Sequence, residues 1–169
     1  MGIQYKFDAE KAIEVLLYIA EQAPDMYHAL KVLYFADKTH LAQYGRLICG
    51  DSYVCMAHGP VPSGVYDMVK TVRDGWSCLS QIPLDESFTM DGYRIIPCRS
   101  ADRDLLSESD MECLDDAIAN CKGKPFDQLQ KMSHDEAYLA ADENDFIPVE
   151  AIIATLPQAD LLLSHLQDA

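Results

Sequence analysis

One stretch of the chain, residues 31 to 66, constrains the fold more than any other part of the sequence. A helix-forming run in this stretch ends at Gly45, a short extended segment follows, and the chain then reaches His58-Gly59-Pro60-Val61-Pro62. Glycine after a helical run is typical of a left-handed C-terminal cap, and prolines stiffen a corner. The stretch therefore predicts a rigid unit in which helix and corner pack together and His58 is hydrogen-bonded inside.

Apolar residues that recur at three-to-four spacing predict helices in and around this unit. The first three are expected over about residues 9–22, 25–44 and 64–74. Asp8 and Ser63 are candidate N-caps of the first and third helices, and Pro24-Asp25 precedes the second.

Two regions between the helices favour extended structure. Leu47-Ile48 and Tyr53-Val54-Cys55-Met56 flank Gly50-Asp51, which indicates two short extended pieces around a turn. Further on, apolar residues flank Asp91-Gly92, a strong signal for a β-hairpin. We therefore expect a small antiparallel sheet inserted among helices.

The rest of the chain predicts further helices. Ser107-Glu108-Ser109-Asp110 resembles a capping box that opens a helix to about Cys121, and Ser133-His134-Asp135-Glu136 repeats the pattern. Pro148 and Pro157 mark two closing helices. We expect a mainly α-helical α+β fold, a single domain over residues 1–169 with about six or seven helices and a small antiparallel β insertion.

Acidic residues outnumber basic ones, and the excess lies in the second half of the chain. The formal net charge is −15, and residues 77–169 alone hold 6 basic and 19 acidic side chains. Such a surface disfavours direct contact with nucleic acid, which requires a basic patch, and speeds association with a basic partner. Three acids of the helix after Ser107 are the candidate partner surface: Glu112, Asp115 and Asp116.

The sequence also carries expectations about location. No apolar run approaches the roughly 20 residues of a membrane span, and the N-terminus lacks the features of a secretory signal. We therefore expect a cytoplasmic protein without membrane contact. In that compartment its six cysteines stay reduced, and we expect them to be packing residues: Cys49, Cys55, Cys78, Cys98, Cys113 and Cys121.

Asp37, His40 and Tyr44 share one stripe of the second helix, at positions i, i+3 and i+7. A carboxylate that orients an imidazole is common in acid–base catalysis, but the same pair also occurs as a structural hydrogen bond at a helix end. Because no nucleophile accompanies the pair, the structural interpretation is favoured.

Cys49, Cys55 and His58 are candidate metal ligands, with His40 or His134 as a fourth. Structural zinc sites usually pair close ligands, as in Cys-x2-Cys, whereas these residues are spaced Cys-x5-Cys-x2-His. We therefore expect neither a bound metal nor another cofactor.

The residues of the helix and corner resemble the Panacea domain family, also called SocA-like or phage-associated. The resemblance covers about residues 10–75. A later Ser-His pair of the family resembles Ser133-His134, although the family often has tryptophan shortly after it, where this chain has Tyr138 or Leu139. The resemblance assigns a scaffold or partner-binding role to twelve residues: Lys31, Tyr34, Asp37, His40, Tyr44, Gly50, Asp51, His58, Gly59, Pro60, Tyr66 and His134.

The resemblance implies an antitoxin that neutralises a cognate toxin by binding it directly, and the acidic half leads us to expect a basic toxin. We expect no enzymatic activity. Two alternatives stay open: an adaptor that delivers a toxin to a bacterial protease, and a metal-dependent or cysteine hydrolase that uses His40, His58 and His134 with a cysteine or an aspartate. Self-association of the chain also stays open.

Overall fold

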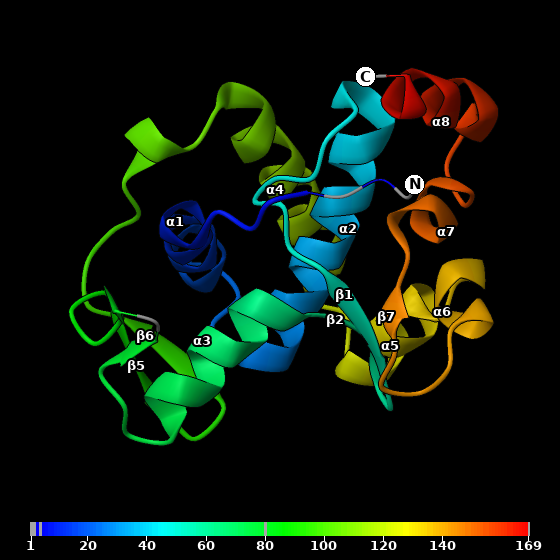
Figure 1. Cartoon of the computed structure of the whole chain (residues 1–169). Coiled ribbons are helices and arrows are strands. Elements are labelled where there is room, and N and C mark those ends of the chain that lie inside the picture. The colour runs from blue at the N-terminus through cyan, green and yellow to red at the C-terminus, as the bar shows by residue number, and fades with distance from the viewer. Residues whose placement is uncertain (1–2, 4, 80, 169) are drawn as a thin grey trace.

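The long helix α2 (Met26–Tyr44) runs through the middle of the molecule, and the other elements pack around it (Figure 1). The computed structural model describes residues 3, 5–79 and 81–168. Within these residues it contains eight α-helices, one short 3-10 helix and seven short strands. The mainly helical α+β fold is confirmed. The helix beyond the expected number is α5, and Ser133 ends it.

The remaining elements have the following bounds in chain order: α1 (Ala9–Ala20), β1 (Tyr53–Met56), β2 (Gly59–Pro62), α3 (Ser63–Arg73), β3 (Cys78–Leu79), β4 (Ile82–Pro83), β5 (Phe88–Asp91), β6 (Arg94–Pro97), the 3-10 helix (Arg103–Leu105), α4 (Glu108–Cys121), α5 (Phe126–Ser133), α6 (Glu136–Ala140), β7 (Phe146–Ile147), α7 (Val149–Ile153) and α8 (Ala159–Gln167).

Local capping sets most helix ends at the expected places. The Asp8 carboxylate accepts a hydrogen bond from the backbone amide of Lys11 at 3.1 Å, and Ser107 forms a complete capping box with Asp110. Gly45 ends α2 with a φ of 76°, the left-handed conformation that glycine adopts without strain.

Two predicted caps are wrong. Ser63 is the first residue of α3, and its predicted capping role is filled by the buried carboxylate of Asp51, which accepts from the amides of Gly64 and Val65 at 2.8 and 3.0 Å. Asp135, in place of Ser133, caps α6. The Asp51 acceptor is distant in sequence from α3, whereas Asp135 directly precedes α6 and Ser133 is still part of α5.

The strands form three small antiparallel sheets among the described residues. The largest has the order β2-β1-β7, so the proline-containing β2 lies at an edge, where a missing amide donor is tolerated. The predicted extended piece at Leu47-Ile48 is wrong, because β1 pairs instead with the Gly59–Pro62 segment. The predicted hairpin is confirmed as β5–β6, with Gly92 and Tyr93 as its turn.

Helix α2 separates two hydrophobic cores. On one side its residues pack with those of α1, α3, α4 and the β5–β6 hairpin. On the other side they pack with β1 and with α6, α7 and α8. A helix buried on two sides must place its polar residues inside the protein, which explains the buried Lys31, Asp37 and His40.

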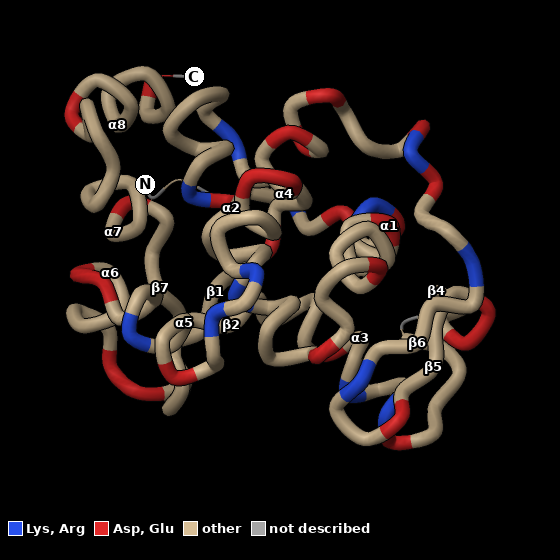
Figure 2. The backbone as a smooth tube through the Cα atoms, turned by 180° about the vertical axis from the view of Figure 1, so that it is seen from behind, with Lys and Arg blue, Asp and Glu red and all other residues tan. Residues whose placement is uncertain are grey.

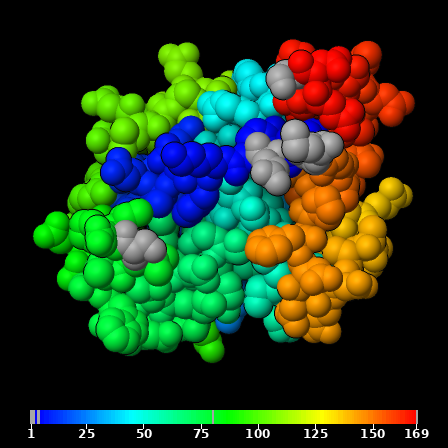
Figure 3. Space-filling model, viewed as in Figure 1, coloured from blue at the N-terminus to red at the C-terminus, as the bar shows by residue number. Residues whose placement is uncertain are grey.

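Residues 5–8, which precede α1, lie on the face shown in Figure 3, and hydrogen bonds from Ile3 and Asp8 connect the start of the chain to both sides of α2. The Asp8 amide donates to the Cys49 carbonyl oxygen at 2.9 Å, and the Ile3 amide donates to the Glu150 carboxylate at 2.5 Å. Among the described helices, none combines the length and apolar character that a bilayer crossing demands.

Candidate functional site

Lys31 and Tyr34 lie one turn apart on α2, and both side chains are buried. The ammonium nitrogen of Lys31 donates a hydrogen bond to the carbonyl oxygen of Pro60 at 3.2 Å. The hydroxyl of Tyr34 donates to the carboxylate of Asp135 at 2.5 Å. Two neighbouring side chains of α2 thus hold the β1–β2 hairpin and the start of α6.

Gly59 brings the hairpin backbone against Lys31. Its φ of 122° lies in a region that L side chains rarely adopt. A Cβ atom here would overlap the Lys31 ammonium nitrogen and lie 2.7 Å from the Ser133 hydroxyl oxygen. Lys31 and Ser133, which are far apart in sequence, therefore meet at Gly59.

His134 completes this group from the link between α5 and α6. Its ring stacks on that of Tyr138, with centroids 4.3 Å apart and planes inclined by 9°. The Tyr138 hydroxyl in turn donates to the Met56 carbonyl oxygen at 2.6 Å. Within the described residues, the buried Nε2 atom of His134 has no hydrogen-bond partner. We call Lys31, Gly59, Ser133 and His134 the Lys31 cluster.

Burial sets the protonation of the Lys31 cluster. It disfavours the ammonium and lowers the pKa of Lys31 to about 8. Burial, and then the charge of Lys31, lower the pKa of His134, so its imidazole is neutral near neutral pH. Although burial opposes it, hydrogen bonds from Lys38 and Tyr34 lower the pKa of Asp135, whose carboxylate stays ionised.

A small cavity of about 120 Å³ lies beside the Lys31 cluster. Its walls are mostly apolar and aromatic, with Lys31 and His58 as the basic groups, and they come from α2, the β1–β2 hairpin, α3 and α5: Tyr27, Leu30, Lys31, Met56, Ala57, His58, Val61, Tyr66 and Phe126.

The prediction that His58 is hydrogen-bonded inside the unit is wrong. The side chain is exposed, and its ring lies edge-on to Phe126 with centroids 6.2 Å apart. His58 occupies the tight β1–β2 turn, where the backbone pairing of the strands turns its side chain outward. The rest of the unit is confirmed, since Lys31 and Pro60 join α2 to the hairpin.

Asp37 and His40 lie further along α2 and bond to different partners. Asp37 accepts from the Ile48 amide at 2.8 Å and the Tyr53 hydroxyl at 2.6 Å, and burial raises its pKa to about 7. His40 bonds the Arg46 carbonyl oxygen at 2.8 Å and the Ser109 hydroxyl at 2.9 Å. Both therefore hold the loop after α2, and no hydrogen bond joins the two in the part of the chain described.

Gly50 and Asp51 belong to the same structural network. Gly50 has a φ of 73°, and a Cβ there would overlap the Lys6 backbone, so the loop can lie against the N-terminal segment only with glycine. Asp51 caps α3, and burial raises its pKa although three backbone amides oppose the shift.

The acidic residues Glu112, Asp115 and Asp116 lie exposed on α4. Figure 2 views the molecule from the side on which α4 lies in front. The Tyr44 hydroxyl donates to Glu112 at 3.3 Å, and the Tyr18 hydroxyl donates to Asp115 at 2.7 Å. Two of the three predicted acids thus also have internal partners.

The cysteines do not form a metal site among the described residues, where no group of three or more metal-binding side chains gathers. Burial raises the pKa of Cys49 well above its usual value, and those of Cys113 and Cys121 to about 11, so these thiols stay protonated. Cys78 and Cys98 are exposed, so the expectation that all six pack inside is wrong.

Sequence reasoning missed several residues around the Lys31 cluster. Asp135 was assigned only to a capping box, and the aromatic walls Tyr27 and Phe126 carry no local signal. Asp110 was likewise assigned only to a capping box, whereas its buried carboxylate also pairs with Lys11 and Arg46 at 2.7 and 3.0 Å. Long-range ion pairs of this kind depend on how helices pack.

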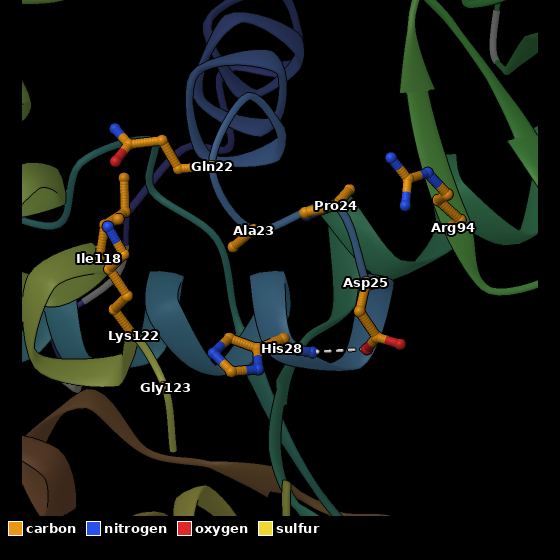
Figure 4. A pocket seen from close by; sticks show the side chains of 9 residues that line it. All are labelled: Gln22, Ala23, Pro24, Asp25, His28, Arg94, Ile118, Lys122 and Gly123. Carbon is orange, nitrogen blue, oxygen red and sulfur yellow. Dashed lines mark hydrogen bonds between the residues drawn. The ribbon is translucent and has the colours of Figure 1, made fainter. Parts of the chain in front are cut away.

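A larger cleft of about 470 Å³ lies at the N-terminal end of α2 (Figure 4). His28 lines it from α2 and Asp25 from the position just before that helix, while Lys122 lines it from just after α4 and Arg94 from β6. His28 Nε2 lies 3.2 Å from the Cys121 carbonyl oxygen, and the Asp25 carboxylate caps α2. These two contacts start α2 and join it to the end of α4, so the polar groups of the cleft have structural roles.

Comparison with known proteins gives one match. The family model of the SocA-like antitoxin, Panacea domain, matches residues 30–138, well over half of the chain. The matched segment runs from α2 to α6 and includes every residue of the Lys31 cluster. No curated protein and no solved structure matches.

Proposed function

Because the chain belongs to the SocA-like antitoxin family with a Panacea domain, we propose that it neutralises a cognate toxin by binding it directly, without chemistry of its own. The observation that carries the proposal is the extent of the family match, which spans both the Lys31 cluster and the acidic helix α4. Its partner is accordingly a toxin protein, which we propose to be basic.

The state of the candidate catalytic groups supports a binding role. Asp37 and His40 have internal partners, and the four buried thiols among the described residues have raised pKa values. Thiols that stay protonated are poor nucleophiles. The exposed acids of α4 offer a surface to which a basic partner would be drawn.

Co-expression with the small protein encoded by the neighbouring reading frame tests this proposal. We expect that protein to stop growth when expressed alone, and growth to resume when this chain is co-expressed. Purified together, the two proteins should form a stoichiometric complex in a strain without the host's ATP-dependent proteases. Growth rescue that requires such a protease, without a stable complex, would contradict direct neutralisation and indicate an adaptor.

A further inference from the structure

Among the described residues, Lys31 is a buried cation without a counter-ion. Its side chain is 2% exposed, and among the described residues its ammonium has a single acceptor, the Pro60 carbonyl oxygen. An ammonium has three donors, so two remain available. The Asp135 carboxylate, which accepts from Tyr34 one helical turn along from Lys31, also accepts from the Lys38 ammonium, with an N–O distance of 2.8 Å.

Two histidines near Lys31 can each offer one further ring N–H to a ligand, in the tautomer that carries the proton on the ring nitrogen facing it. His58 lines the same cavity, and the buried Nε2 atom of His134 has no partner within the described chain. Burying a cation without an anion costs free energy, and residues that carry such a cost commonly belong to functional sites. The Lys31 cluster is therefore arranged to receive a negative group.

The cavity limits what that group can be. Cavities of roughly 150 Å³ hold a benzene ring, so the 120 Å³ here fits a slightly smaller group. The aromatic walls from Tyr27, Tyr66 and Phe126 suit a short apolar stem, and Lys31 and His58 suit a charged end.

We propose that this cavity is a carboxylate-binding site, which in the toxin complex receives a carboxylate on a short apolar stem from the toxin. A glutamate side chain and a C-terminal residue share this chemistry. The identity of the occupant rests on the proposed function, whereas the binding of a carboxylate does not.

Butyrate and its uncharged analogue butyramide test the site on the isolated full-length chain. NMR spectra of the histidine rings should show saturable shifts of His58 and His134 with butyrate, and at least tenfold weaker binding of butyramide. Equal binding of the two probes, or no shift at either histidine, would overturn the site.

Substitutions then assign the binding to Lys31. Lys31→Met should weaken butyrate binding at least tenfold with an unchanged or higher Tm, whereas Lys131→Met removes an equal charge from an exposed position of α5 and should have no effect. His58→Gln, at an exposed position, should weaken binding several-fold even if Lys31→Met folds poorly. Unchanged affinity in Lys31→Met or His58→Gln would contradict the proposal.

Two peptides distinguish the sources of the carboxylate. One carries an internal glutamate and an amidated C-terminus, and the other carries a free C-terminus and no acidic side chain. Competition with butyrate by either peptide supports the site and identifies the source of the carboxylate.

If the toxin binds Lys31→Met as tightly as the wild type, the cavity is not the toxin's contact, although toxin neutralisation itself would stand.

Discussion

At the scale of single residues, this protein buries several charged or polar side chains, although burial disfavours their charged forms. Lys31, Asp37, His40 and Asp110 are each at most 2% exposed. Asp110 is compensated by ion pairs and Asp37 by two hydrogen bonds, whereas in the described part of the chain the Lys31 ammonium bonds a single carbonyl oxygen. Their titration should therefore appear in the pH dependence of stability.

Lys31→Met should be more stable than the wild type at pH 7. The pKa of Lys31 is about 8 in the folded protein against an ordinary 10.5, so the unfolded chain binds the proton more tightly. Wild-type stability should rise as the pH increases from 8 to 10.5, by up to about 3 kcal/mol, and the variant should lack this rise. Denaturant unfolding across that range measures both, with Lys131→Met as the control. A less stable Lys31→Met at pH 7 would show that the ammonium is structural.

Asp37→Asn should change the pH dependence of stability below pH 7. Burial raises the Asp37 pKa to about 7 from 3.8, so between these values the folded protein holds a proton that the unfolded chain releases. Wild-type stability should therefore fall as the pH rises from about 4 to about 7, by up to about 4 kcal/mol. The variant should lack this fall, so the difference in free energy of unfolding between wild type and variant should change with pH over this range. If the free energies of unfolding of the two proteins depended on pH in the same way, the pKa of Asp37 would not be raised in the folded protein.

At the scale of elements, helix ends depend on both near and distant acceptors. Asp8, Asp25 and Ser107 cap α1, α2 and α4 from the adjacent position, as short-range patterns require. Helix α3 instead depends on Asp51, which lies before β1 and reaches the helix because the β1–β2 hairpin folds back. The cap of α3 is therefore a tertiary contact.

Asp51→Ala should destabilise the protein by about 2 to 3 kcal/mol, because it leaves the amides of Gly64 and Val65 without their acceptor. Asp67→Ala is the matched control, since Asp67 lies exposed on the same helix and its carboxylate forms a weak surface ion pair with Lys70, at 3.5 Å. The shift in urea midpoint at constant m-value measures the effect. Equal midpoints for the two variants would show that Asp51 does not stabilise α3.

At the scale of the whole molecule, the negative charge forms a field that several elements share. The net charge of −15 includes acids on α4 and a second exposed acidic segment between α6 and β7, at Asp142, Glu143 and Asp145. Long-range attraction acts mainly on the association rate, whereas short-range contacts set the lifetime of a complex. The two acidic segments can therefore be compared by kinetics.

Reversal of Glu112, Asp115 and Asp116 to lysine should slow toxin association about tenfold at low salt and flatten its salt dependence. Dissociation should change by less than about twofold. Reversal of Asp142, Glu143 and Asp145 changes the net charge equally and is the matched control. Stopped-flow measurements at several ionic strengths give both rates. An equal effect of the two reversals would assign the attraction to net charge and not to α4.

The sequence by itself determined the features that depend on neighbours along the chain. It predicted α1, α2, α4, the Gly45 cap and the β5–β6 hairpin, because apolar periodicity, capping residues and turn glycines act within a few residues. It also predicted that α2 packs against the Gly59-Pro60 segment, from the glycine that ends the helix and the prolines that stiffen the corner.

Only the tertiary structure decided which of these residues meet. Sequence spacing placed His58 inside and paired Asp37 with His40, whereas the fold exposes His58 and gives each of the other two its own partners. The Lys31 cluster joins α2, the β1–β2 hairpin and the α5–α6 link, and α3 forms part of the wall of the adjacent cavity. Its chemistry arises from burial and from contacts between distant segments, and neither quantity is a local property of the chain.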